Sequence, residues 1–211
     1  MLKLYFAKGT IASAVAIALN EAGADYQAIR IDFGTGEQTT EAYSAINPKG
    51  RVPALQTNQG ILTETSAILD YIAALYPTAG LVPDDPFQAA QMRSVMTYLA
   101  STAHVNHAHG MRGTRWADKP ASWEDMKQKV TETMTASAAY IETHALQGPF
   151  VLGDRISLAD PYLYSVSTWL AADGVDMTPF PKLTAFQTKM QTRPSVLKAV
   201  ADGILKGTSA A

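Results

Sequence analysis

The sequence predicts a mixed α/β domain followed by an all-helical domain, and three observations support this division. Residues 1–76 alternate short period-two apolar runs with apolar stretches of helical length. The segment 76–86 contains three prolines and a glycine, as is typical of a linker. Beyond it the strand pattern stops, and apolar residues recur at helical spacing. We therefore predict a first domain at residues 1–77, a linker at 78–86 and a helical domain at 87–211.

The first elements predict a β-α-β unit. Residues 2–6 alternate with period two and read as a strand. Residues 11–19 are too long and too rich in alanine for a strand, so we predict a buried helix that stops at Gly23. Alternation resumes over residues 29–33 and predicts a second strand. A strand, a helix and a returning parallel strand form a right-handed unit.

The rest of the first domain predicts a short helix, a turn, a hairpin and a longer helix. The helix at 41–46 is brief, and Asn47 to Gly50 has the residue order of a type I turn. Residues 54–57 and 61–63 flank an Asn-Gln-Gly segment, which favours a hairpin. An amphipathic helix follows at 65–76. In the second domain, helices are predicted around residues 92–103, 126–141, 157–172, 181–191 and 194–205.

Composition excludes several classes of protein. With 211 residues, 47% of them hydrophobic and 17% charged, the chain can bury a core and is not a disordered protein. A net charge of −2 argues against a nucleic-acid partner, and no apolar run reaches the ~18 residues of a membrane span. The absence of cysteine excludes disulfides and thiolate metal sites and favours a cytoplasmic protein. Any thiol chemistry must use a thiol supplied by a substrate.

Three motifs carry a family resemblance. They are Arg51-Val52-Pro53-Ala54-Leu55, the segment from Leu62 to Ile72, and the segment from Gly153 to Asp160. In this order and spacing, the chain from Met1 to about Lys206 resembles the cytosolic glutathione transferases. The resemblance implies a thioredoxin-like N-terminal domain and a C-terminal helical bundle domain.

Within that family the chain is most similar to the bacterial beta-type enzymes, through Asn47-Pro48-Lys49-Gly50 and Thr63-Glu64. Two positions depart from the beta-type pattern. Beta-type members have a cysteine where this chain has Ile11, and the tyrosine of their first strand aligns with Phe6. The mixed-disulfide route that a site cysteine allows is therefore closed to this protein.

The resemblance implies a glutathione site in the first domain. Glu64 would bind the ammonium group, while the Thr65 hydroxyl and the free N–H groups of the following helix would bind the carboxylate. The alternative is that Thr65 is a plain helix cap and Glu64 a surface acid. A cis bond before Pro53, also implied by the resemblance, would let the N–H and C=O of Val52 pair with the cysteinyl backbone like an added strand.

Activation of the thiol is the catalytic requirement. A thiol with a pKa of ~8.5 is only about 3% thiolate at pH 7, and lowering that pKa by ~2 units requires ~2.7 kcal/mol of differential stabilisation. Thr10 follows Gly9 at the start of the first predicted helix, where a hydroxyl and free N–H groups converge. We expect Thr10 to donate to the thiolate, assisted by the Ile11 N–H. Ser13 is the rival, and an ordinary N-cap is the other role open to Thr10.

Three of the four histidines crowd into residues 104–109. His104 and His107 share a helical face, whereas His109 points elsewhere, and no third ligand suggests a metal site. The resemblance aligns His104 with a helix histidine that lies near the thiol in beta-type enzymes. A histidine packed at the domain interface is the alternative.

The sequence therefore predicts a glutathione transferase that conjugates the glutathione thiolate to small hydrophobic electrophiles in detoxification. It would act in the cytoplasm as a homodimer, with glutathione as co-substrate, no other cofactor, no metal and no nucleic-acid or membrane partner. Two alternatives stay open. One is a thiolysis or reductive-cleavage enzyme of the same family. The other is a non-catalytic relative that binds glutathione, another ligand or a partner.

Overall fold

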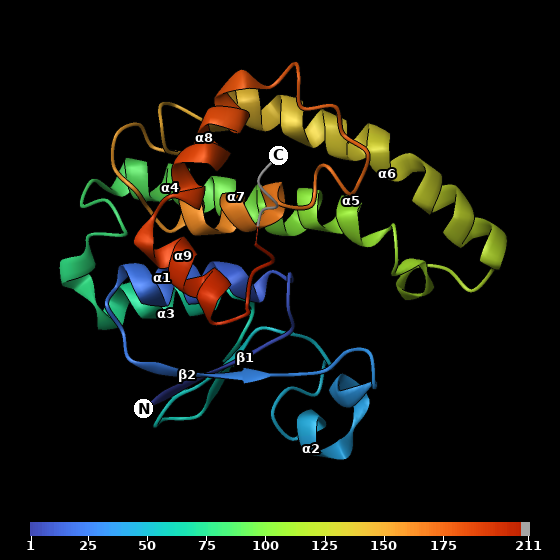
Figure 1. Ribbon diagram of the computed structural model, residues 1–211, viewed down its shortest axis with the longest axis horizontal. Coiled ribbons are helices and arrows are strands. Elements are labelled where there is room, and N and C mark those ends of the chain that lie inside the picture. Colours follow the sequence, from blue (N-terminus) through green and yellow to red (C-terminus); the bar gives the residue numbers. More distant parts are fainter. Residues whose placement is uncertain (208–211) are drawn as a thin grey trace. The chain divides into compact units, whose positions relative to one another are not determined.

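The computed structural model describes residues 1–207, shown in Figure 1. The chain packs as two compact units. The first contains Met1–Pro83 together with the residues from Met190 onward, and the second is Asp84–Lys189. The predicted architecture of a mixed α/β part and a helical part is confirmed. Among the described residues, no helix is long and apolar enough to cross a membrane.

A four-stranded sheet in the order β2-β1-β3-β4 forms the centre of the first unit. The strands are β1 (Leu2–Phe6), β2 (Tyr26–Arg30), β3 (Ala54–Gln56) and β4 (Ile61–Thr63). β1 pairs in parallel with β2 and antiparallel with β3, and β3 and β4 form the predicted hairpin. This mixture of one crossover and one hairpin is the topology expected of a thioredoxin-like domain.

Helices α1 (Ala12–Glu21) and α3 (Thr65–Leu75) pack together on one face of this sheet (Figure 1). Every residue of α1 from Ala12 to Leu19 is buried, which explains its alanine-rich sequence. The short helix α2 (Glu41–Ser44) follows a 3-10 turn at Glu37–Thr39. Its Tyr43 packs in a second small core with Tyr5, Ile31 and Ala54.

The second strand was predicted at residues 29–33 but lies at Tyr26–Arg30. Its limits follow from parallel pairing with β1, in which Leu2 is opposite Tyr26 and Phe6 is opposite Arg30. Ile31 and Phe33 lie beyond the end of the strand. Their apolar character is explained by packing, because both contact the cluster that contains Tyr43. The alternation of apolar residues therefore correctly predicted that this segment packs in the interior. It placed the strand three residues too late in the sequence.

The C-terminal helix α9 (Pro194–Ala201) packs on α1. The Asn20 side chain donates to the Ser195 carbonyl at 2.8 Å, and the Arg193 guanidinium donates two hydrogen bonds of 2.7 Å to Glu21. The predicted helical domain, 87–211, includes this segment, and its limits stay a prediction. By packing, α9 belongs to the first compact unit.

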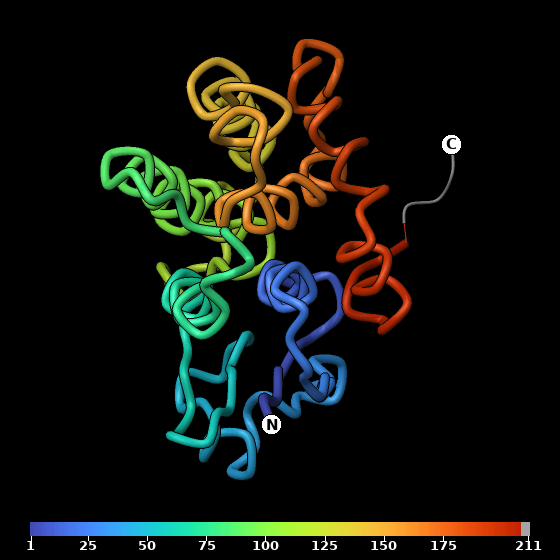
Figure 2. Tube along the Cα trace, turned by 90° about the vertical axis from the view of Figure 1, so that its left-hand side faces the viewer, coloured from blue at the N-terminus to red at the C-terminus, as the bar shows by residue number. Residues whose placement is uncertain are grey.

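The second unit is built from helices (Figure 2). They are α4 (Pro86–Tyr98), α5 (His104–Ala108), α6 (Pro120–Tyr140), α7 (Ala159–Ser167) and α8 (Pro181–Gln191), the last running to the unit boundary. Two five-residue π-helical segments, Leu99–Ala103 and Ile141–Ala145, follow α4 and α6. Short 3-10 turns lie at Pro77–Ala79, in the first unit, and at Gly113–Arg115.

A fully buried carboxylate, that of Asp160, organises the start of α7. It accepts hydrogen bonds from the N–H groups of Val151 and Ser157, both at 2.7 Å, and from the Ser157 hydroxyl at 2.9 Å. A buried carboxylate is tolerated only when its oxygens are paired in this way. The Gly153–Asp160 motif therefore has a structural role in starting the helix.

Candidate functional site

The sheet register brings three loops of the first unit to one edge. Tyr5 lies opposite Ala54, and Ala54 lies opposite Thr63, so these three residues form a row across β1, β3 and β4. The chain beyond that row is the loop after β1, the segment before β3 and the first residue after β4. Thr10, Val52 and Glu64 lie on these three segments. Residues far apart in the sequence are thus placed at one end of the sheet.

Thr10 does not cap the first helix. Its hydroxyl donates to the Ala7 carbonyl at 2.7 Å, and the residue at the N-cap position of α1 is Ile11, whose side chain has no hydrogen-bonding group. The single proton of the Thr10 hydroxyl is therefore engaged with the backbone. Donation to a thiolate requires this hydroxyl to rotate away from Ala7.

The backbone at the start of α1 offers donors that need no such rotation. In the described part of the chain, the N–H groups of Ile11 and Ala12 have no hydrogen-bond partner. The Ser13 N–H is the first to be engaged, with the Thr10 carbonyl at 3.1 Å. Unpaired N–H groups at a helix start carry the positive end of the helix dipole and favour an anion.

Ser13, the rival to Thr10, faces the interior. It is only 1% exposed, and its hydroxyl donates to the Thr10 carbonyl at 2.9 Å. A ligand at the surface cannot reach this hydroxyl. Between the two hydroxyls, only Thr10 remains a candidate for contact with a bound thiol.

The Val52–Pro53 peptide bond is cis, as the resemblance implied. Among the residues described, neither the N–H nor the C=O of Val52 has a hydrogen-bond partner. The carbonyl oxygen of the preceding residue, Arg51, is fixed by two hydrogen bonds. It accepts one from the Tyr43 hydroxyl at 2.7 Å and one from the Asn47 side-chain amide at 2.6 Å. Burial raises the pKa of Tyr43 to about 12, so its hydroxyl remains a donor at neutral pH. This arrangement leaves one donor and one acceptor of Val52 available to an extended ligand.

Glu64 has an unusual backbone conformation. Its φ is 71° and its ψ 118°, and it is the one non-glycine residue with positive φ in the described chain. Strained residues of this kind persist mainly where a function requires them. Its side chain is 69% exposed and forms an ion pair with Lys49, whose ammonium also donates to the Thr63 hydroxyl at 2.8 Å. The sequence indicated Lys49 only as part of the Asn47-Pro48-Lys49-Gly50 motif, and the ion pair makes it a further candidate for the site.

The start of α3 is open to an anion. The first intrahelical backbone bond runs from Ile68 to the Glu64 carbonyl at 3.0 Å. The N–H groups of Thr65, Ser66 and Ala67 have no partner in the described residues. The Thr65 side chain makes no hydrogen bond to a described residue and is not the cap of its helix. The N-terminus of α3 therefore has the donors that a carboxylate needs.

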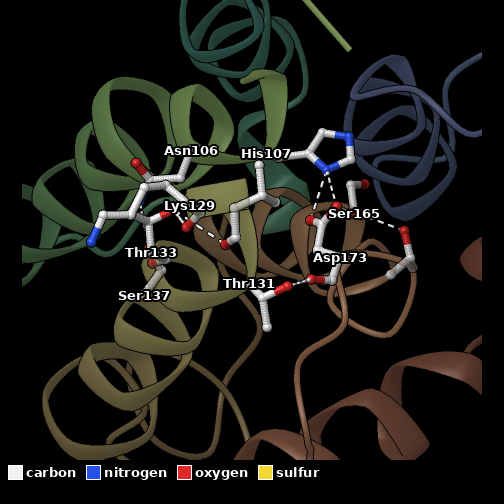
Figure 3. Close-up of polar contacts among 10 residues, drawn as sticks. Asn106, His107, Lys129, Thr131, Thr133, Ser137, Ser165 and Asp173 are labelled. Atoms are coloured by element: carbon white, nitrogen blue, oxygen red, sulfur yellow. Dashed lines mark hydrogen bonds and ion pairs between the residues drawn. The ribbon is translucent and has the colours of Figure 1, made fainter. Parts of the chain in front are cut away.

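His104, the predicted site residue of the second unit, begins α5 directly after the π-helical segment. Its ring lies 5.0 Å from the Trp169 ring, centroid to centroid. His107, on the same face, packs on the same tryptophan and pairs with Asp173 (Figure 3). The sequence did not reveal Asp173, since it is 66 residues away. The described residues contain no group of three side chains that could hold a metal ion.

The chain is similar to known proteins over most of its length. The family model described as the glutathione S-transferase N-terminal domain matches residues 1–74, and the model of the C-terminal domain matches residues 108–202. The chain is 28% identical to the glutathione S-transferase GstA of Escherichia coli O157:H7, over 96% of this chain and all of that protein. It is 30% identical to the maleylacetoacetate isomerase of Pseudomonas aeruginosa, over 94% of this chain and 95% of that one.

Two solved structures extend the comparison. A glutathione transferase homolog from Sulfitobacter, crystallised with bound glutathione, is 58% identical with a TM-score of 0.96. The alignment covers 97% of this chain and 99% of that one. A beta class glutathione S-transferase from Sphingomonas chungbukensis is 30% identical with a TM-score of 0.82, over 95% and 98% of the two chains.

Proposed function

Since the chain belongs to the glutathione S-transferase family, whose co-substrate is glutathione, we propose that it conjugates the glutathione thiolate to small hydrophobic electrophiles. The family predicted from the motifs is confirmed, and so is glutathione as co-substrate. One observation supports the proposed site above all others. Unpaired backbone groups on the Thr10 loop, at Val52 and at the start of α3 lie along one edge of the sheet.

The γ-glutamyl end of glutathione would bind at α3. Its carboxylate would accept hydrogen bonds from the N–H groups of Thr65 and Ser66, and its ammonium would pair with Glu64. In the structure, the Glu64 carboxylate pairs with the Lys49 ammonium. When glutathione binds, Glu64 would either share its carboxylate between Lys49 and the ligand ammonium or release Lys49. The released cation would then lie close to the carboxylate of the ligand.

The middle of the tripeptide would pair with Val52. Its cysteinyl N–H and C=O would form two backbone hydrogen bonds with the unpaired groups of that residue, in the manner of an added antiparallel strand. The cis bond to Pro53 is part of this geometry. These two bonds would place the cysteinyl side chain toward the loop that carries Thr10.

The thiolate would be stabilised at the start of α1. The Ile11 N–H is unpaired and needs no rearrangement, and the Thr10 hydroxyl would add a second donor after leaving Ala7. Charge-assisted donors in a fixed position supply the stabilisation that a lowered thiol pKa requires. The protein would then hold the electrophile near the sulfur.

We further propose that the enzyme is a cytoplasmic homodimer with a role in detoxification. These statements rest on membership of the family and on the absence of cysteine in the sequence. Light scattering on the purified chain tests the dimer, because a mass of one chain at micromolar concentration would contradict it.

A second candidate reaction is glutathione-dependent isomerisation. Relatives named isomerases include the maleylacetoacetate isomerase of Pseudomonas aeruginosa and the maleylpyruvate isomerase of a Ralstonia species. The second is 29% identical over 87% of this chain. Thiolysis or reductive cleavage with glutathione is a third. All three would begin with attack by the same thiolate. They differ in the acceptor and in whether glutathione stays on the product, is released unchanged or is oxidised.

Calorimetric titration with glutathione, followed by rate measurements with a panel of acceptors, tests the proposal. The panel should contain an aryl halide, an epoxide, an α,β-unsaturated ketone, a cis-dicarboxylic enone and an aryl ether. Binding with turnover of the first three supports conjugation, and turnover of only the fourth or fifth supports the isomerase or the cleavage enzyme. Retention on immobilised glutathione with no turnover of any acceptor would favour the non-catalytic relative.

A further inference from the structure

The loop that carries Thr10 is joined to the C-terminal segment of the chain, and both lie in the first compact unit. Helix α9 packs on α1, as Figure 2 shows (red beside blue). Beyond α9, Ile204 and Leu205 are buried, at 0% and 4% exposure. The Ile204 carbonyl accepts a hydrogen bond from the Gly9 N–H at 2.9 Å. These contacts fix the position of the next residue, Lys206, relative to the start of α1.

The side chain of Lys206 lies along the backbone of Gly9. A Cβ at Gly9 would lie 3.4 Å from Cε, 3.7 Å from Cγ and 3.8 Å from Cδ of this lysine. The apolar stem of the lysine therefore packs on the glycine while the residue as a whole stays exposed, as is usual for long basic side chains. The ammonium group is one bond beyond Cε. It is thus held beside the loop that leads into α1.

No carboxylate of these two segments neutralises the ammonium of Lys206. Among the described residues, Lys206 forms no ion pair and no hydrogen bond. The only charged residues in 7–13 and 203–207 are lysines. The carboxylate that precedes Lys206 most closely in the sequence, that of Asp202, is paired with Lys198 at 2.7 Å. The loop and the C-terminal segment therefore present positive charge together.

This positive charge is added to a helix start that already favours an anion. The Ile11 N–H is unpaired in the described chain and carries part of the helix dipole. Other side chains at this point contribute little, because Phe6 and Ile11 have no polar group and the Thr10 hydroxyl donates to a backbone carbonyl. A lysine side chain supplies a full charge and three donors. Its contact with Gly9 is the observation that places a cation beside the start of α1.

We propose that the Lys206 ammonium binds the thiolate of glutathione and supplies its counter-charge. This inference rests on the proposed function, in which the sulfur lies at the start of α1. The thiol proton is released to water, the lysine stays an ammonium, and the ion pair lasts until the sulfur bonds to the electrophile. Lys206 is then a catalytic residue that the C-terminal segment contributes to the first domain.

The exposure of Lys206 limits the size of its effect. Two unit charges ~4 Å apart in bulk water interact strongly enough to lower a thiol pKa by about 0.7 unit, and more strongly near a protein surface. We therefore expect Lys206 to lower the thiol pKa of bound glutathione by about 0.7–1.5 units. Salt screens a solvent-exposed pair of this kind.

The test measures the thiol pKa of bound glutathione from the ultraviolet absorbance of the thiolate against pH. Lys206→Met keeps an apolar stem over Gly9 and removes the charge, so the pKa should rise by about 0.7–1.5 units. Lys206→Arg retains the charge and should keep the wild-type value. Lys3→Met is the matched control, because Lys3 lies near the start of β1, at the other end of the strand from the loop. The same loss of charge there should leave the thiol pKa unchanged.

The rate of conjugation gives a second measurement that a merely structural role would not reproduce. Below the thiol pKa, kcat/KM of Lys206→Met should fall about 2- to 6-fold, because less thiolate is present but the more basic thiolate is more nucleophilic. Above that pKa the deficit should disappear. Urea unfolding checks the fold, and the midpoint should stay close to the wild-type value because Lys206 is exposed.

Two results would overturn the role of Lys206. One is an unchanged thiol pKa in Lys206→Met, and the other is an equal rise in Lys206→Met and Lys206→Arg, which would show that packing on Gly9 matters and charge does not. In the wild type, raising the ionic strength from about 0.1 M to about 1 M should raise the thiol pKa more than in Lys206→Met. If the wild type does not bind glutathione, or binds it without lowering the thiol pKa, the proposed thiolate site fails as well. A lowered pKa that persists in Lys206→Met refutes only the role of Lys206.

Discussion

The Gly9 N–H donates to the Ile204 carbonyl at 2.9 Å, which joins the loop before Thr10 to the C-terminal segment. Gly9 has a φ of +73°, in the left-handed region that favours glycine. A Cβ at this position would lie 3.4 Å from Cε of Lys206. The C-terminal segment therefore supports the loop on which the proposed thiolate site is built.

We predict that Gly9→Ala lowers the free energy of unfolding by about 1–2 kcal/mol, the cost of a left-handed non-glycine residue, and also lowers kcat/KM. Gly23→Ala is a matched control, because Gly23 has a φ of +64° and a Cβ added there would meet no atom within 4 Å. Urea unfolding should give similar losses for both variants. An equal loss of kcat/KM in the two would contradict a specific role for the Gly9 loop.

We predict that Glu64→Gln raises the Kd for glutathione about 10- to 100-fold, because the ammonium of the ligand loses a charge-assisted hydrogen bond. The exposed ion pair with Lys49 contributes little to folding, so the unfolding midpoint should stay nearly constant. Titration calorimetry measures the affinity. Glu132→Gln, which breaks another exposed pair, with Lys129, is the control, and an unchanged Kd for Glu64→Gln would assign the carboxylate to the surface alone.

Thr10→Ala separates the hydroxyl from the backbone as the activator of the thiol. If the hydroxyl donates to the thiolate, its removal should raise the thiol pKa of bound glutathione by about one unit or more, since a hydrogen bond to a charged group is worth ~1.5–3 kcal/mol. Ultraviolet absorbance of the thiolate against pH measures this. Ser13→Ala, at a buried hydroxyl, should affect stability only. If the thiol pKa of bound glutathione is unchanged in Thr10→Ala, the Ile11 N–H, not the Thr10 hydroxyl, is the donor to the thiolate.

The Glu21–Arg193 pair predicts an acid-dependent contribution to stability. Burial raises the pKa of Glu21, but hydrogen bonds from Arg193 and Ser195 and the Arg193 charge outweigh it, so the pKa lies below its ordinary value of 4.5. A lowered folded-state pKa gives stability that is complete above the unfolded-state pKa and is lost as the pH falls through the folded-state value. Glu21→Gln should therefore unfold more easily than the wild type at pH 7.

That difference should shrink as the pH falls below about 4.5. Urea unfolding at a series of pH values measures it. Asp202→Asn, which removes the ion pair with Lys198 at the end of α9, serves as the control. It should lower the free energy of unfolding much less than Glu21→Gln at pH 7. A constant difference between wild type and Glu21→Gln across the acid range would contradict the lowered pKa.

The sequence by itself predicted the elements whose signals are local. The period-two run of β1, the alanine-rich α1 and the turn residues of the β3–β4 hairpin lie where they were expected, and the Val-Pro motif implied the observed cis bond. Helical spacing also placed His104 and His107 on one face. These features depend on residues a few positions apart, so the pattern contains the information.

Only the tertiary structure decided which groups are free and which are paired. It moved β2 to the register of β1, turned the Thr10 hydroxyl to Ala7 and buried Ser13. It also brought Asp173 to His107 across 66 positions. The physical reason is that a hydrogen bond depends on the position of both partners in space, and burial depends on every element packed against a residue. Neither quantity is a property of a local sequence pattern.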